Sequence, residues 1–250
     1  MIKRLTLPGL MVLLALPLVL SWTPLEILKL KVFDSWIKDQ EPSGLFVTLD
    51  ITEEDVQQEG GWPFPRKRLA EIHMDLLHSG AMGVGYVIAF SEPDRFGGDE
   101  EFASVLGLYP SVIAMFETNN KEYPATTGTV ILGDDIGGVM LQGATENIKM
   151  LRDNAYQGIS SAPIDVDGLT RRLPLLMRTP DGWTPAFGTQ ILKVLAGADT
   201  YVIKTNENGI EQIRVKGIPP VSVDSFGRKW ISWVDTPSTT LQEMNVKDKF

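Results

Sequence analysis

The chain has 250 residues, of which 43% are hydrophobic, so it can bury one sizeable core or two small ones. We expect a single domain. The formal net charge of −9 argues against a nucleic-acid partner, because phosphate binding needs clustered lysines and arginines. The sequence contains no cysteine, which excludes disulfides and thiolate chemistry.

The N-terminus is typical of a membrane anchor. Lys3 and Arg4 precede an uncharged run that begins at Leu5 and ends at Trp22, about the minimum length of a membrane-spanning helix. No small-residue cleavage site ends the run, so we expect residues 1–22 to form a cytoplasmic tip and an uncleaved span. Basic residues before a span keep the N-terminus in the cytoplasm. Residues 23–250 are therefore expected on the periplasmic or extracellular side of an inner membrane.

Apolar periodicity predicts an alternation of helices and strands after the span. Helices are expected over residues 23–39, 66–79, 99–108, 144–155, 185–195 and 241–250. Strands are expected over residues 45–51, 84–90, 112–116, 212–215 and 229–234. Strands and helices alternate at the start, which implies parallel pairing with buried central strands, and the last strands form an antiparallel extension. The expected fold class is α/β, a single mixed-sheet domain with flanking helices.

The first of these helices carries an apolar stripe and continues from the membrane span. Its start is marked by Thr23 as N-cap and Pro24 at the first helical position. The apolar residues recur at intervals of three and four, as on one face of a helix. They are Leu25, Leu28, Val32, Phe33, Trp36 and Ile37.

A β-hairpin is expected between residues 158 and 177. Two apolar runs, residues 158–164 and 173–177, flank an Asp-rich turn, and Gly168 in that turn is expected to have a positive φ angle. Arg171 and Arg172 follow on opposite faces of a strand, so at most one can share a pocket with Asp165 or Asp167. The alternative interpretation is a solvated turn with a weak surface ion pair.

Three segments together resemble the CHASE2 family. They are Gly-Trp-Pro-Phe-Pro-Arg at residues 61–66, Phe-Ser-Glu-Pro-Asp at residues 90–94 and Asp-Val-Asp-Gly-Leu-Thr-Arg-Arg-Leu-Pro-Leu at residues 165–175. The resemblance runs from about Leu25 to the end of the chain. It implies the extracytoplasmic sensory domain of a bacterial receptor, such as an adenylate or guanylate cyclase or a sensor kinase. Asp34 matches a residue that is often seen in the family's first helix.

The same resemblance suggests what would follow this sequence in a complete receptor. In the family, a last buried strand, three transmembrane helices and a cytoplasmic effector come next. We therefore expect residues 23–250 to be a CHASE2-like sensory domain that lacks its last strand, with the effector absent.

The candidate ligand-binding residues lie in the three motif segments. Prolines hold Trp62 and Phe64 at the start of a helix, either as a hydrophobic plug or as a pocket wall with Arg66 facing an anionic or polar ligand. Glu92 and Asp94 end a strand, and ligands gather outside the carboxyl ends of parallel strands. The turn that carries Asp167 and Arg171 is expected to close this site.

No catalytic residue, metal or cofactor is expected. His73 and His78 are five residues apart on one helix, do not share a face and are read as satisfied surface histidines. Glu92 and Asp94 are an unconvincing pair for glycoside hydrolysis, which needs two carboxyl groups at a defined separation. The sequence also lacks a nucleophile elbow and a phosphate-binding loop.

These features predict a sensory input domain that binds an unidentified small molecule or envelope component. The membrane is a second partner, through the run from Leu5 to Trp22, and a homodimer through the N-terminal helix is a third. Two alternatives stay open. One is a membrane-anchored envelope hydrolase of the α/β class, and the other is a structural interaction module with an exposed apolar patch but no small-molecule pocket.

Overall fold

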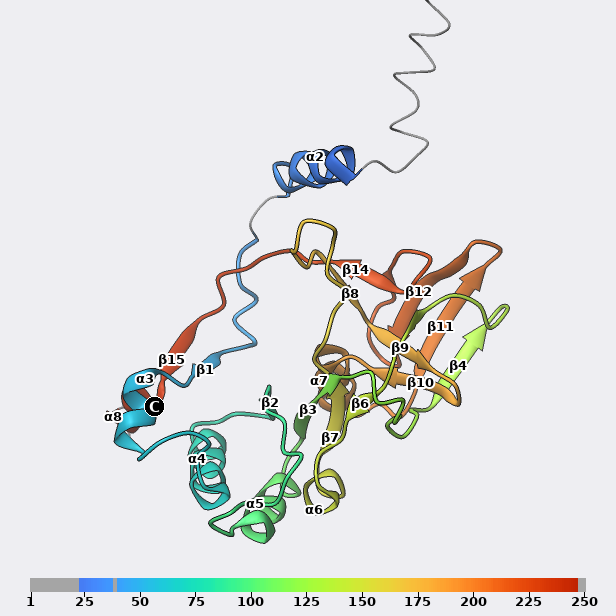
Figure 1. Ribbon diagram of the computed structural model, residues 1–250. Helices are drawn as coiled ribbons and strands as arrows, with labels where there is room; N and C mark the ends of the chain where they lie inside the picture. The colour runs from blue at the N-terminus through green and yellow to red at the C-terminus, as the bar shows by residue number, and fades with distance from the viewer. Residues whose placement is uncertain (1–22, 38–39, 247–250) are drawn as a thin grey trace, which may run out of the picture.

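A computed structural model describes residues 23–37 and 40–246, which form a mixed α/β structure (Figure 1). The helices are α2 (Thr23–Asp34), α3 (Glu53–Gln58), α4 (Arg66–His78), α5 (Asp99–Leu106), α6 (Lys149–Arg152), α7 (Phe187–Leu195) and α8 (Leu241–Val246). The predicted α/β class is confirmed, but the strands form several small sheets in place of one.

The first sheet holds the apolar strands that the sequence pattern predicted. Its strands are β2 (Val84–Tyr86), β3 (Ser111–Glu117), β6 (Ala144–Thr145) and β7 (Tyr156–Ile159). Strand β3 pairs in parallel with both β2 and β7, and antiparallel with β6. The predicted parallel pairing is thus confirmed for the second and third expected strands. Helix α7 contacts β3 and β7. The backbone of Phe187 comes close to Gly158, because a Cβ on residue 158 would lie only 2.6 Å from the Cα of Phe187.

A second group of strands builds most of the C-terminal half. A four-stranded sheet contains β4 (Thr129–Leu132), β11 (Tyr201–Asn206), β12 (Gly209–Val215) and β13 (Val221–Ser222). Beside it lie β5 (Val139–Met140), β9 (Leu176–Thr179) and β10 (Gly182–Pro185). A core that includes Trp183, Tyr201 and Ile203 holds these strands together. Of this group, the sequence pattern predicted β12 and, in the expected hairpin arm over residues 173–177, the start of β9.

The predicted hairpin is wrong. Strand β7 pairs with β3, while β8 (Arg172–Pro174) pairs with β14 (Arg228–Trp230) and β9 pairs with β10. The segment between β7 and β8 does contain the expected tight turn, in which the N–H of Gly168 donates to the carbonyl of Asp165. Gly168 has a φ of +84°, as predicted. The turn therefore connects strands of different sheets.

The helix predicted over residues 144–155 is also wrong, since β6 and a short α6 occupy this segment. Buried Asn147 explains the break. Its side-chain oxygen accepts from the N–H of Phe90 at 2.7 Å, and its amide nitrogen donates to the carbonyl of Ala114 at 3.0 Å. These bonds hold residue 147 against neighbouring segments in a conformation that a continuous helix would not allow.

Strand β1 (Thr48–Asp50), expected in the parallel sheet, pairs instead with β15 (Ser238–Thr240). The two strands run in parallel, with Thr48 opposite Ser238, and lie at one side of the molecule (Figure 1). Helices α3 and α8 follow them directly. Asp55 and Thr52 cap α3 reciprocally, and Val56 of α3 packs in the same hydrophobic core as Leu241 and Met244 of α8.

The first predicted helix is shorter than expected. Helix α2 ends at Asp34, and backbone hydrogen bonds continue the turn to Ile37. No helix in residues 23–37 or 40–246 has the length and apolar character that crossing a membrane requires. The span predicted from Leu5 to Trp22 lies outside the described residues.

Candidate functional site

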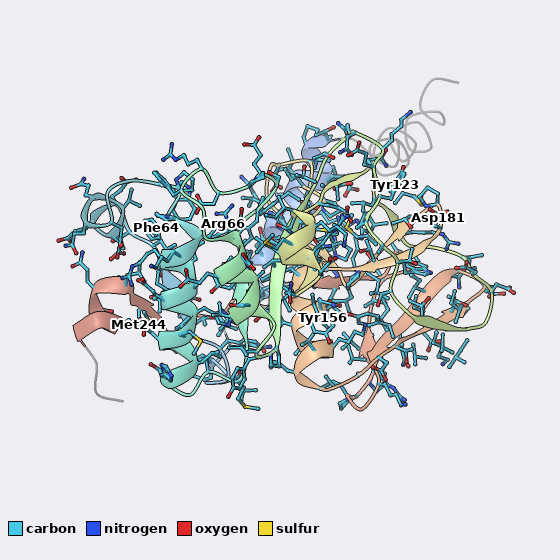
Figure 2. All side chains as sticks on the ribbon, turned by 90° about the horizontal axis from the view of Figure 1, so that it is seen from below. Phe64, Arg66, Tyr123, Tyr156, Asp181 and Met244 are labelled. Atoms are coloured by element: carbon cyan, nitrogen blue, oxygen red, sulfur yellow. The ribbon has the colours of Figure 1, made fainter. Side chains whose placement is uncertain are left out.

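The first part of the predicted site is gathered in one hollow. Trp62, Phe64, Arg66, Glu92 and Asp94 all line a depression of about 430 Å³, which we call the Arg66 hollow. It lies where α4 begins, beside the segment that follows β2. Figure 2 shows Phe64 and Arg66 at this end of α4. The loops before α4 and after β2 therefore meet, although β1, the strand that precedes the first loop, does not belong to the sheet of β2.

The two aromatic residues have different places in the hollow. Phe64 is fully buried and belongs to the core that includes Phe90 and Phe102. Trp62 is exposed, and its ring meets that of Phe64 edge to face at 5.1 Å between centroids. Phe64 is therefore a hydrophobic plug, and Trp62 forms a wall of the hollow, so each of the two interpretations left open holds for one residue.

Arg66 is a buried polar side chain of the hollow with an incomplete set of hydrogen bonds. The residue is only 8% exposed, and its guanidinium lies 4.4 Å from the centroid of the Phe90 ring. One terminal nitrogen reaches the carbonyl of Glu92 at 3.5 Å, whereas Nε has no hydrogen-bond partner and lies 3.5 Å from Asp99. Burial lowers the pKa of Arg66 against the opposing charges of Asp99 and Asp94, yet a guanidinium keeps its charge in proteins.

Asp94 supports the helix that carries Arg66. Its Oδ2 accepts from the backbone N–H of Arg66 at 2.7 Å, at the start of a helix whose N-cap residue, Pro65, offers no side-chain cap. Its other oxygen accepts from the N–H of Phe96 at 3.1 Å, and its own N–H donates to Asp99. Asp94 thus caps α4 from a distant loop. Asp99, which accepts from the backbone N–H of Asp94, was not among the predicted site residues.

The rest of the predicted site lies elsewhere. Asp167 and Arg171 are not among the residues that line the Arg66 hollow, so the turn does not close it. The guanidinium of Arg171 instead binds both oxygens of Asp34 on α2, at 2.7 and 2.8 Å, and both oxygens of Asp167, at 2.8 and 2.7 Å. Its donors are occupied by these carboxylates, which explains why it is not available to the hollow.

The alternative interpretation of this turn, a solvated turn with a weak surface ion pair, is wrong. Arg171 is buried, with 3% of its side chain exposed, and one nitrogen lies 3.4 Å from Asp165. Hydrogen bonds from Arg171 lower the pKa of Asp167 to about 2 and hold the pKa of Asp34 below its ordinary value. The turn is therefore built around a buried arginine with three carboxylates.

Arg172 contradicts the expectation that only one of the two arginines reaches the acidic pair. Its guanidinium binds Asp165 and lies 5.1 Å from the Trp230 ring centroid, while Arg171 contacts the other oxygen of the same carboxylate. Arg171 precedes β8, where strand alternation does not apply, and both side chains are long enough to bend toward Asp165. We call the set of these two arginines and three carboxylates the acidic clamp, which consists of Arg171, Arg172, Asp34, Asp165 and Asp167.

His73 is wrongly predicted as a surface histidine, whereas His78 is exposed as expected. His73 is fully buried, and its Nδ1 lies 2.9 Å from the hydroxyl of Tyr86. Burial lowers the pKa of His73 to about 4 and raises that of Tyr86. Within residues 23–37 and 40–246, no group of three or more histidines and carboxylates is placed to hold a metal ion.

The fold and this site define a mixed α/β domain with a shallow hollow walled by aromatic and charged side chains. The family model of the CHASE2 domain matches residues 10–249. This match covers nearly the whole sequence, so the chain belongs to the CHASE2 family. CHASE2 domains are extracytoplasmic sensory domains. Searches of curated proteins and of solved structures found no match.

Proposed function

We propose that this chain is the sensory input region of a transmembrane signalling receptor and that it binds a small polar molecule in the Arg66 hollow. The proposal rests on the burial and the incomplete hydrogen bonding of Arg66. This residue is a nearly buried cation that faces a hollow and has a donor, Nε, without a hydrogen-bond partner. Buried donors without partners are uncommon. Because Nε lies 3.5 Å from Asp99, an incoming acceptor would bind the terminal nitrogens, one of which reaches only the carbonyl of Glu92 at 3.5 Å.

The lining suggests the chemistry of the ligand. A carboxylate or phosphate suits a guanidinium, because both accept two parallel hydrogen bonds. The exposed face of Trp62 offers apolar contact next to this charge. Glu92 and Asp94 add negative charge at the same rim, and Arg95 adds a second positive charge. A small molecule that combines an anionic group with a donor group fits this mixed lining better than a lipid or a polymer.

The membrane connection completes the proposal. We infer that the uncharged run from Leu5 to Trp22 spans the membrane and that the positive charges before it keep the N-terminus inside. The domain then lies outside, where its family's domains act. The receptor's effector is proposed to be a cytoplasmic cyclase or kinase, as the family resemblance implies.

Anchoring and orientation can be tested separately from ligand binding. A reporter that is active only outside the cytoplasm, fused after Phe250, is expected to be active. Mass spectrometry of the membrane-extracted protein is expected to find residues 1–22 still attached. Recovery of a soluble form that begins near Thr23 would contradict the anchor.

Ligand binding can be screened with the full chain in detergent. We expect at least one compound among succinate, inorganic phosphate and the free amino acids to raise the unfolding temperature in proportion to its concentration, since a ligand that binds only the folded state stabilises it. If none of these compounds raises the unfolding temperature at millimolar concentration, the proposed ligand class is wrong.

A further inference from the structure

The turn before β8 has an inverted distribution of polar and apolar side chains. Asp165 and Asp167 point inward to the arginines of the acidic clamp, and their side chains are only 8% and 10% exposed. The apolar residues between and around them point outward, with Ile164 70%, Val166 62% and Leu169 55% exposed. Turns in water usually show the reverse arrangement. An apolar environment outside the domain would account for it.

Helix α2 has a similar exposed apolar face. Leu28, Val32 and Trp36 follow one another at intervals of four residues, and all three are exposed. The domain holds the opposite side of the helix, where Leu30 is buried and the ring of Phe33 lies 4.1 Å from that of Trp230. The apolar stripe predicted from the sequence thus divides between two faces, and only one of them packs on the domain.

These two apolar surfaces lie next to each other. The guanidinium of Arg171 binds Asp34 of α2 and Asp167 of the turn at the same time. Figure 1 shows the loop before β8 beside α2 at one end of the molecule. Together Leu28, Val32 and Trp36 with Ile164, Val166 and Leu169 form what we call the apolar rim.

Charge on α2 indicates what covers the apolar rim. With a turn of about 100° per residue, Lys29 and Lys31 fall on the two sides of the exposed stripe. An apolar stripe between lysines is typical of a helix that lies in a membrane interface, where the ammonium groups reach water and lipid headgroups. The chain itself places a bilayer within reach, because Thr23, the first residue of α2, directly follows the uncharged run that ends at Trp22.

We propose that the apolar rim rests on the lipid bilayer, with α2 lying along its surface and the turn at Ile164–Leu169 contacting the same interface. The inference rests on the proposed membrane anchor. The acidic clamp then fixes the domain to a helix that is itself in contact with lipid. A second copy of the chain is the competing occupant of this face.

Spin labelling can distinguish lipid from protein, because the chain has no cysteine of its own. Single variants Val32→Cys and Val166→Cys are labelled in the full chain, reconstituted in phosphatidylcholine and phosphatidylglycerol vesicles. Leu108→Cys is the matched control, an exposed apolar position two residues after α5. Helix α5 lies at the end of the molecule away from α2 (Figure 1). The ratio of oxygen to water-soluble nickel collision rates is expected to be several-fold higher at positions 32 and 166 than at 108.

Two results would overturn the inference. Collision ratios at 32 and 166 equal to that at 108 would place the apolar rim in water. Labels shielded from both reagents, with spin–spin broadening between copies, would show that a second copy covers this face. A Leu13→Cys label decides the anchor by itself. If this label is in lipid while the other two are not, only the apolar-rim inference fails, whereas a water-exposed label at 13 refutes the proposed anchor.

Discussion

Asp34 and Arg171 are separated by 137 residues and form a two-point ion pair that joins helix α2 to the turn before β8. Both guanidinium–carboxylate contacts are shorter than 2.9 Å, the geometry in which arginine binds a carboxylate with most directional specificity. The same guanidinium holds Asp167. A buried arginine therefore attaches α2 to the domain, in addition to the packing of Leu30 and Phe33.

Replacing Arg171 is expected to destabilise the domain more than replacing Asp34. Arg171→Gln leaves Asp34, Asp165 and Asp167 without their shared cation, whereas Asp34→Asn leaves the arginine bound to the other two. Thermal denaturation measures the difference. Lys204→Gln is the control, since its ion pair with Glu211 is exposed and such pairs contribute about 0–1 kcal/mol. An Arg171→Gln unfolding temperature equal to that of the control would contradict the acidic clamp.

Gly168→Val is expected to cost about 1–2 kcal/mol, because a β-branched residue is strained at a φ of +84°. A Cβ at this position meets no atom within 4 Å, so the loss would come from the backbone conformation. Urea denaturation measures it. Gly188→Ala in α7 serves as the control, because a Cβ is equally free there, φ is not positive, and alanine stabilises helices by about 0.5–1 kcal/mol. Equal stability of Gly168→Val and the wild type would contradict the positive φ angle at residue 168.

His73 is expected to make stability depend on pH. Its pKa in the folded protein is about 4, below the value of about 6.5 in an unfolded chain. Between these values the unfolded state binds the proton and the folded state does not, so stability is full above about pH 6.5 and falls as the pH drops toward 4. His73→Gln should remove this part of the pH dependence and His78→Gln should keep it. Identical slopes of unfolding temperature against pH for the wild type and His73→Gln would contradict the buried neutral histidine.

Asp94→Ala is expected to cost about 0.5–2 kcal/mol through loss of the α4 cap. Asp94→Asn keeps an acceptor oxygen and should lose less. Asp75→Ala, at an exposed position of the same helix, controls for the general effect of alanine. Chemical denaturation of the three variants gives the comparison. Equal stability of Asp94→Ala and Asp75→Ala would contradict the role of Asp94 as the cap of α4.

Local signals in the sequence predicted the elements around the Arg66 hollow. Pro65 before α4 and Gly80 after it marked the helix within a residue or two, and unbroken apolar runs marked β2 and β3. The loops before α4 and after β2 meet as expected, but the expected reason is wrong, because β1 pairs with β15 and not with β2.

Features that depend on contacts between distant residues could not be predicted from local sequence signals. Residues 158–177 suggested a hairpin, yet β7 pairs with β3 and β8 pairs with β14. Strand β11 alternates buried with more exposed residues, but its sequence, Tyr-Val-Ile-Lys-Thr-Asn, does not alternate apolar and polar side chains, so no local pattern marked it. Asp34 was noticed only through the family resemblance, because no local pattern shows that a carboxylate on α2 would meet an arginine 137 residues away.

Titration calorimetry measures whether Arg66 receives the ligand. The compound with the largest stabilising effect among succinate, inorganic phosphate and the free amino acids is titrated into the wild type, Arg66→Lys and Arg68→Lys. Arg68 is the matched control, because it lies on the same helix but binds Glu59 and Glu71 outside the hollow. We expect at least tenfold weaker binding for Arg66→Lys, about 1.4 kcal/mol, and unchanged binding for Arg68→Lys. Equal affinity of all three proteins would contradict this role of Arg66.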